Sequence, residues 1–207
     1  NEIGHSGIER SGESLLGIDF NPTFDSLESA VSEYDKMYRS ESQVAASLQA
    51  VTRPIANAHW FFTEGDPEVI RYLEGMLFSP RSPVKWKSFL LQGGLHILHG
   101  FGIFEKIWKR LPDGDIVIEK LAHRKATSIY GWEFQEKNGK PTDDLRAIVK
   151  KPRNNGFAIN DTDYPRIPVE QAVHFVINQE GDSPQGEGSF RSAYPPYYFK
   201  DMIRRLA

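Results

Sequence analysis

The fold of this chain is decided by one stretch near the end of the printed sequence, Gly186-Glu187-Gly188-Ser189-Phe190-Arg191-Ser192-Ala193-Tyr194-Pro195-Pro196-Tyr197-Tyr198-Phe199-Lys200. Gly186 and Gly188 allow backbone angles that other residues avoid, so we expect a sharp turn there. Ser189 carries a hydroxyl of the kind that caps the free amides at the start of a helix. The stretch therefore predicts a glycine-rich turn that leads into a helix.

The helix that follows is predicted to be amphipathic. Apolar side chains recur at helical spacing on one face, at Phe199, Met202, Ile203 and Leu206. The opposite face carries charged side chains, at Lys200, Asp201, Arg204 and Arg205. This periodicity is typical of a helix with one buried face, and we expect the segment to continue past Ala207.

The chain before this stretch begins with helical patterns. Asp25 or Ser26 can cap a first helix, and Ser42 opens a second one that Pro54 should bend or end. The aromatic residues 59–63 are expected to form a short strand, because β-branched and aromatic residues favour strands.

Two more helices are expected before the chain changes character. Asp66-Pro67-Glu68 combines a cap, a first-turn proline and an acid, and predicts a helix with a buried apolar stripe over residues 69–77. Ser82-Pro83 is expected to open the next helix.

The second half of the chain predicts antiparallel strands. Residues 103–110 and 116–123 flank Pro112-Asp113-Gly114-Asp115, which is typical of a hairpin turn. Residues 128–134, 144–149 and 172–177 predict further strands. Helices followed by strands and a final helix indicate an α+β fold, with N-terminal helices packed on an antiparallel, hairpin-rich sheet.

Composition limits the classes of function. The net charge of −3 argues against a protein that simply coats nucleic acid, although residues 1–50 hold −6 and residues 51–207 hold +3. The chain has no cysteine, so it has neither disulfides nor thiolate metal sites. No apolar run approaches the ~20 residues that span a bilayer, so no membrane partner is expected.

Candidate catalytic residues are few. His96 and His99 have a spacing that can place two metal ligands on one helical face, but no third ligand is nearby in the sequence. Glu105 and Glu119 lie on the two arms of the predicted hairpin, where an acid and base pair or a charge-paired sheet face are the alternatives. The glycines of residues 181–186 lack the lysine of a phosphate-binding loop, because Glu187 stands in its place. No catalytic residue, metal or cofactor is assigned.

Basic side chains occur in three places that could touch phosphates without reading bases. They are Lys85 and Lys87 on either side of Trp86, Lys150, Lys151 and Arg153 in a basic loop, and Arg204 and Arg205 in the final helix. We take the five residues of the loop and the final helix as the candidate DNA contacts.

Four blocks in order give the chain a family resemblance. Residues 34–48, Ala58-His59-Trp60-Phe61-Phe62, residues 100–108 and the block at 186–200 together resemble the portal proteins of tailed bacteriophages, and most closely the Mu-like portal group. Only residues 186–200 are matched residue by residue, as a corner that leads from the body of a portal into its stem.

The resemblance implies a structural protein and not an enzyme. Portal proteins form a ring, typically of about twelve copies, at one capsid vertex, through which double-stranded DNA is packaged and ejected. Their partners are the major capsid protein, the terminase motor, and the head-completion and tail proteins. The implied location is the virion, after assembly in the host cytoplasm. Two alternatives stay open: a metal-dependent hydrolase or nucleic-acid-modifying domain that uses His96, His99, Glu105 and Glu119, and a generic interaction module.

The expected organisation has three parts. Residues 1–23 form an acidic, flexible arm, because they are rich in Gly, Ser and Glu. Residues 24–188 form the α+β body, which the resemblance likens to a portal wing. Residues 189–207 begin the helix that leads toward the stem.

Overall fold

The computed structural model describes residues 21–137, 140–152 and 164–206. Its helices are α1 (Leu27–Ser40), α2 (Ser42–Asn57), α3 (Pro67–Leu77), α4 (Trp86–Gly93), α5 (His96–His99) and α6 (Tyr194–Leu206). Its strands are β1 (Phe101–Arg110), β2 (Ile116–Arg124), β3 (Ile129–Lys137), β4 (Lys140–Lys150), β5 (Arg166–Pro168) and β6 (Ala172–Val176). The predicted α+β class is confirmed.

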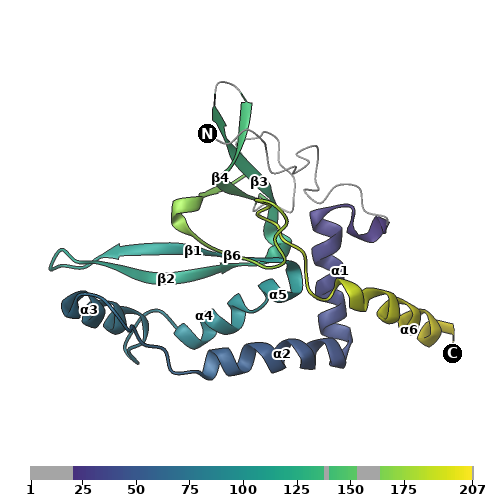
Figure 1. Cartoon of the computed structure of the whole chain (residues 1–207), viewed down its shortest axis with the longest axis horizontal. Coiled ribbons are helices and arrows are strands. Elements are labelled where there is room, and N and C mark those ends of the chain that lie inside the picture. Colours follow the sequence, from purple (N-terminus) through teal and green to yellow (C-terminus); the bar gives the residue numbers. More distant parts are fainter. Residues whose placement is uncertain (1–20, 138–139, 153–163, 207) are drawn as a thin grey trace.

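The strands form two antiparallel sheets. The first has the order β2-β1-β6, so the last strand lies beside the first. The second has the order β3-β4-β5. The β1–β2 hairpin extends to one end of an elongated molecule and α6 to the other, while β3 and β4 project away from the helices (Figure 1).

Two of the helix starts follow the predicted caps. The Ser26 side chain accepts a hydrogen bond from the Ser29 amide at the start of α1. The Asp66 carboxylate accepts from Glu68 and Val69 at the start of α3, with Pro67 in the first turn. Pro54 lies inside α2, which ends three residues later at Asn57. Local capping chemistry therefore decides where these helices begin.

Two local predictions are wrong. Residues 59–63 are not a strand, because their aromatic rings pack against other rings: Trp60 against Trp86 at 6.0 Å and Phe62 against Phe78 at 5.7 Å. The fourth helix begins at Trp86 and not at Ser82. The Ser82 hydroxyl accepts from the Val84 amide at 2.9 Å, which makes a turn before the helix.

The hydrophobic core has two centres. One lies where α1, α2, α5 and α6 meet, and includes the fully buried Met37 and Leu98. The other joins α1 to both sheets through Val31, Ile103 and Ile148. Helix α1 contributes to both centres, so it ties the helical end of the molecule to the sheets.

The predicted apolar stripe of α3 is only half-buried. No residue of the helix is fully buried: Val69 is 54% exposed, and the other stripe residues, Ile70, Leu73, Met76 and Leu77, are of intermediate exposure. Helix α3 lies beside the β1–β2 hairpin, where the Tyr72 hydroxyl donates to the Ile116 carbonyl at 2.8 Å.

Candidate functional site

The turn before α6 is held against the junction of α5 and β1. The Ile177 amide donates to the Gly100 carbonyl, the Glu187 amide to the Ile177 carbonyl, and the Ser189 amide to the Ile97 carbonyl, all at 2.9 to 3.1 Å. Ser189 thus pairs its backbone with α5, and α6 begins only at Tyr194 after a 3-10 turn over Arg191–Ala193. The prediction that Ser189 caps the helix is wrong, but the predicted turn is present.

Two glycines allow this close approach for different reasons. Gly186 has φ +60°, and a Cβ there would collide with the carbonyl oxygens of Ile177 and Gly100. Gly188 has no positive φ, but a Cβ would collide with the Leu98 carbonyl oxygen. The first glycine is therefore required by conformation and space, and the second by space alone.

Helix α6 is fixed to the body through its first turns. Tyr194 and Tyr197 are buried against α1, and the Tyr194 ring packs edge-on to Phe24 at 5.0 Å. One turn later, the Lys200 ammonium donates to the Glu41 carboxylate at 2.6 Å. This hydrogen bond holds the pKa of Glu41 below its usual value.

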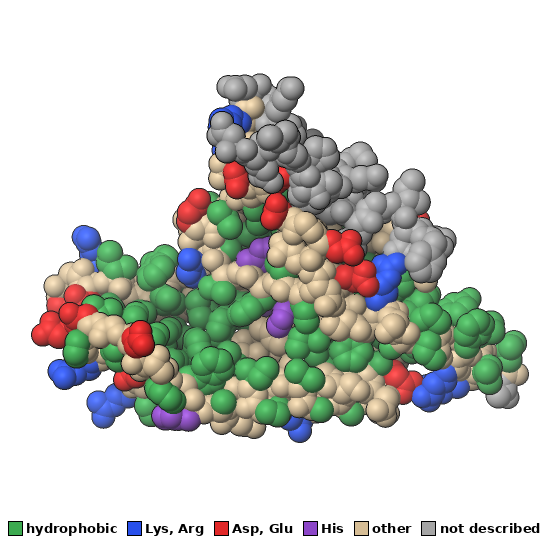
Figure 2. Space-filling model, viewed as in Figure 1, with side chains coloured by type: hydrophobic (Ala, Val, Ile, Leu, Met, Phe, Trp, Pro, Cys, Tyr) green, Lys and Arg blue, Asp and Glu red, His purple; other side chains and the backbone are tan. Residues whose placement is uncertain are grey.

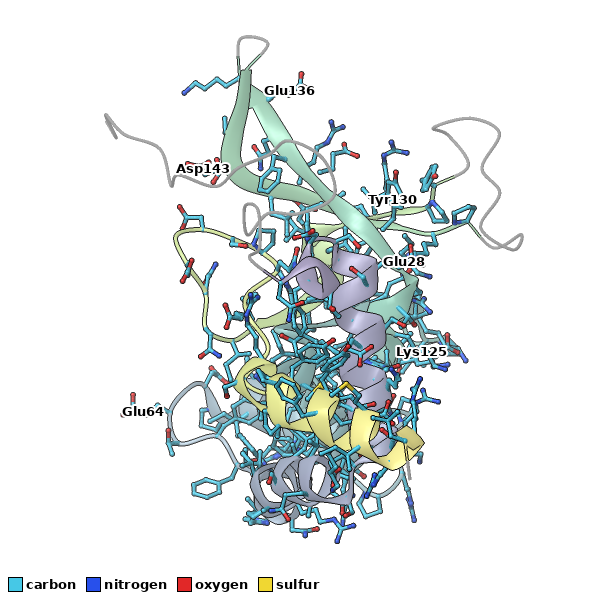
Figure 3. The ribbon with its side chains drawn as sticks, turned by 90° about the vertical axis from the view of Figure 1, so that its right-hand side faces the viewer. Glu28, Glu64, Lys125, Tyr130, Glu136 and Asp143 are labelled. Atoms are coloured by element: carbon cyan, nitrogen blue, oxygen red, sulfur yellow. The ribbon has the colours of Figure 1, made fainter. Side chains whose placement is uncertain are left out.

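The outer face of α6 is exposed and apolar. It carries the side chains of Tyr198, Phe199, Met202, Ile203 and Leu206, which we call the α6 surface. The exposed fractions of these side chains lie between 40% at Met202 and 82% at Leu206. Hydrophobic side chains gather over this end of the molecule (Figure 2), and α6 crosses in front of α1 when the molecule is viewed from that end (Figure 3).

The α6 surface includes the four residues that the sequence predicted to lie on one helical face. Periodicity found the face correctly, but its expected burial is not observed within the described residues. The side chains that anchor α6 are the tyrosines one to two turns earlier. A run of exposed apolar residues of this kind marks an interaction surface more often than an ordinary surface.

The candidate catalytic residues are not brought together. The His96 Nδ1 donates to the Gly93 carbonyl at 2.8 Å, while Glu105 pairs with Arg124 on the neighbouring strand. Glu119 lies 3.8 Å from Lys109. Among the residues that the structure describes, no group of three metal-ligating side chains occurs.

His99 has a structural partner. It is buried, and its Nε2 lies 2.7 Å from Asp35 Oδ1 of α1. The hydrogen bond from His99 lowers the pKa of Asp35 below its usual 3.8, against the opposing effect of burial. The pair joins α5 to α1 across the core, which accounts for a buried polar side chain without any catalytic role.

The candidate DNA contacts lie on separate elements. Lys150 ends β4, and Lys151 contacts Glu28 of α1 at 2.6 Å. Arg205 pairs with Asp201 at 2.7 Å, whereas Arg204 is exposed next to it in the last turn of α6. Arg153 lies outside the described residues.

A comparison with protein families adds a decisive finding. The model of the family described as the portal protein of Mu bacteriophage matches residues 31–206. The chain belongs to this portal family. The match spans α1 to α6 and therefore both sheets and the turn before α6.

Membership makes this a bacteriophage portal protein, a structural class and not an enzymatic one. A search of curated proteins gives no match. Within the described parts of the portal chain, no helix is both long and apolar enough to cross a membrane.

Proposed function

We propose that this portal chain is the subunit of a ring at one capsid vertex, through which double-stranded DNA enters and leaves the head. The observation that carries the proposal, beside the family match, is the exposed α6 surface. An apolar surface of this kind is stabilised when a neighbour covers it, because burial of each large apolar side chain contributes about 1.5 to 3 kcal/mol.

The distribution of exposed apolar side chains supports a head-to-tail contact. The α6 surface lies at one end of the molecule (Figure 1). A second set lies on α3 and the β1–β2 hairpin at the other end, at Val69, Tyr72, Trp108 and Ile116. Two different surfaces at opposite ends suit a heterologous contact, which closes into a ring when its rotation allows. We propose a ring of about twelve copies on the family's pattern.

DNA contact in this ring would be electrostatic and independent of sequence. The exposed Arg204 is the strongest of the candidate contacts, and Lys150, Lys151, Arg153 and Arg205 are weaker candidates, since Lys151 and Arg205 already pair with acids. Few phosphate contacts suit a channel along which DNA must slide. The proposed protein partners are the major capsid protein, the terminase motor, and the head-completion and tail proteins, and the proposed location is the portal vertex of the virion.

Electron microscopy and mass photometry of the purified chain test the ring. We expect closed rings with a central hole for the wild type, and monomers for the double variant Ile203→Asp with Leu206→Asp. The matched control, Ile203→Leu with Leu206→Ile, keeps the surface apolar and should form rings. Monomers for the wild type at every concentration, or intact rings for the acidic variant, would count against the proposal.

A second experiment tests the DNA contact. When duplex DNA binds to rings of the Arg204→Glu variant, the slope of log K against log salt concentration should be shallower by about one than for the wild type.

A further inference from the structure

The outer edge of β2 is free over its second half. Strand β2 is the end strand of its sheet and pairs only with β1 among the described residues. Helix α3 covers the first part of this edge: the Tyr72 hydroxyl donates to the Ile116 carbonyl, and the Ile118 amide points to the Met76 sulfur at 3.5 Å. These side-chain contacts stop at Ile118, and Glu119 is left out of the β1–β2 register at a bulge. The outward backbone groups of residues 120–124 are therefore the ones with which a new strand could pair.

A groove of about 770 Å³ follows this free edge. It is lined by residues 119–125, without a gap, and by α4 residues on the opposite wall. Alternate side chains of a strand point to opposite faces of its sheet, so a hollow lined by consecutive residues runs along the edge of the strand. The groove therefore presents backbone hydrogen-bonding groups and not only side chains.

The floor of the groove is apolar and firmly supported. Phe89 of α4 packs edge-on against Phe104 of β1 at 4.7 Å, and Phe104 lies 5.0 Å from the His123 ring. Val84 and Leu121 also line the groove. Because Phe89 and Phe104 are buried, the wall formed by α4 keeps a fixed position beside the strand.

The rim of the groove is cationic. Lys85, Lys120 and Lys125 are exposed and form no ion pair within the described residues. Lys125 lies at the outer margin of the molecule (Figure 3). Arg124 is neutralised by Glu105, and Glu119, the one acid on the rim, is half exposed and 3.8 Å from Lys109. Lys85 Nζ donates to the Ser82 carbonyl at 3.4 Å, and none of the three ammonium groups pairs with an acid among the described residues. The three lysines therefore disfavour pairing with a basic strand and favour an acidic one.

We propose that this groove binds an extended, acidic peptide segment of a partner protein, which adds a strand to the edge of β2 beyond Ile118. Backbone hydrogen bonds would hold the peptide, apolar side chains would contact the floor, and acidic side chains would meet the lysines. A peptide of about six residues at roughly 3.3 Å per residue matches the free part of the strand. Nucleic acid is disfavoured because the exposed lining offers no aromatic platform for bases.

Fluorescence anisotropy with a labelled octapeptide of alternating Asp and Val tests the proposal on the full chain. We expect saturable binding that weakens at least about tenfold in the double variant Lys85→Glu with Lys120→Glu. The matched control is Arg53→Glu with Lys137→Glu, which changes the net charge equally at exposed sites away from the groove and should bind normally. Equal loss in both double variants would overturn the proposal, because it would indicate attraction by net charge.

A second probe separates strand addition from simple charge contact. The same octapeptide with N-methyl groups on its Val residues keeps all charges and loses the amide donors of one edge. A second octapeptide carries the N-methyl groups on its Asp residues. We expect at least one of these two peptides to lose binding about tenfold, together with slowed hydrogen exchange at residues 119–124 when the unmodified peptide is bound.

Three outcomes overturn the inference. The first is that both methylated peptides bind as tightly as the unmodified peptide, and the second is that an octathymidylate strand binds more tightly than the peptide. The third is a shift from oligomer to monomer when Lys85 and Lys120 are changed to Glu, because it would assign the groove to a second copy of this chain. Ring formation is tested separately at the α6 surface, so failure of either idea leaves the other standing.

Discussion

At the scale of single residues, His123 and His174 should make the protein less stable at acidic pH. His123 is half-buried beside the Phe104 ring, and the Nε2 of the half-buried His174 donates to the Pro184 carbonyl at 2.8 Å. Burial lowers the pKa of both side chains below the usual 6.5. For His123, neighbouring cations lower the pKa further, by less than burial does. For His174, the hydrogen bond to Pro184 raises the pKa, but burial has the larger effect. Both residues therefore favour a neutral ring in the folded state.

The sign of the resulting pH dependence follows from these directions. Above about pH 6.5 both rings are neutral in the folded and unfolded chain, so stability is at its full value. Below 6.5 the unfolded chain binds protons that the folded chain resists, and the free energy of unfolding falls by up to about 1.4 kcal/mol per pH unit for each ring. Urea unfolding at a series of pH values from 7.5 to 5 measures this slope.

His123→Gln should flatten the slope, whereas His59→Gln, at an exposed site, should leave it unchanged. An unchanged slope in the His123 variant would contradict the proposed origin. Asp35 affects stability at a lower pH than the two histidines, because its pKa is held below 3.8. Its contribution to the free energy of unfolding is lost only as the pH falls through that lowered value.

Gly186 provides the second prediction at this scale. Gly186→Ala places a methyl group against two carbonyl oxygens at φ +60°, so we expect the free energy of unfolding to fall by at least about 2 kcal/mol. Gly75→Ala is the opposite case: the residue lies in α3 with nothing within 4 Å of an added Cβ, and alanine there should stabilise by up to about 1 kcal/mol. Thermal unfolding of both variants checks the pair, and a similar loss in both would contradict the conformational argument.

At the scale of elements, α6 depends on its first two turns. Tyr197→Ala removes a buried ring from the junction with α1 and should cost about 3 kcal/mol. Tyr198→Ala, one residue on, removes a ring that is 51% exposed and should change stability by less than about 0.5 kcal/mol in the monomer. Hydrogen exchange along α6 should accelerate only in the first variant, and equal acceleration in both would show that the helix is held differently.

Sequence alone predicted the bounds of the helices and strands better than it predicted which elements pack or pair together. The caps at Ser26 and Asp66 and the Asp113-Gly114 turn act within a few residues, so α1, α3 and the β1–β2 hairpin were found with nearly correct bounds. The strand prediction for residues 59–63 is wrong because no strand in the described chain pairs with them. Their aromatic rings pack against other aromatic rings instead. The pairing of β6 with β1 joins residues about seventy positions apart, and no local pattern encodes it.

The candidate sites show the same limit. The helical periodicity of the apolar residues revealed the stripe on α6, but this periodicity does not indicate which molecule covers the stripe. His96, His99, Glu105 and Glu119 had plausible spacings, yet their partners Gly93, Asp35, Arg124 and Lys109 come from contacts that only the folded chain defines. The groove beside β2 was missed because consecutive residues at a strand edge have no signature in a sequence.

At the scale of the whole molecule, the central question is which symmetry the α6 surface serves. In a two-fold dimer both copies use the same surface, whereas in a ring each copy offers one surface to one neighbour and a different surface to the other. The exposed apolar residues at both ends of this elongated chain favour the second arrangement. The two arrangements respond differently to a chain with a damaged α6.

Mixing experiments with the variant Ile203→Asp and Leu206→Asp exploit this difference. In a ring, the variant still accepts the α6 surface of a wild-type copy but offers none of its own, so each variant ends a growing arc. We expect substoichiometric variant to replace rings with short open oligomers that contain one variant at an end, as native mass spectrometry can count. A two-fold contact would exclude the variant and leave wild-type assemblies intact. The variant's own melting temperature should match the wild-type monomer's, because both substituted side chains are already exposed.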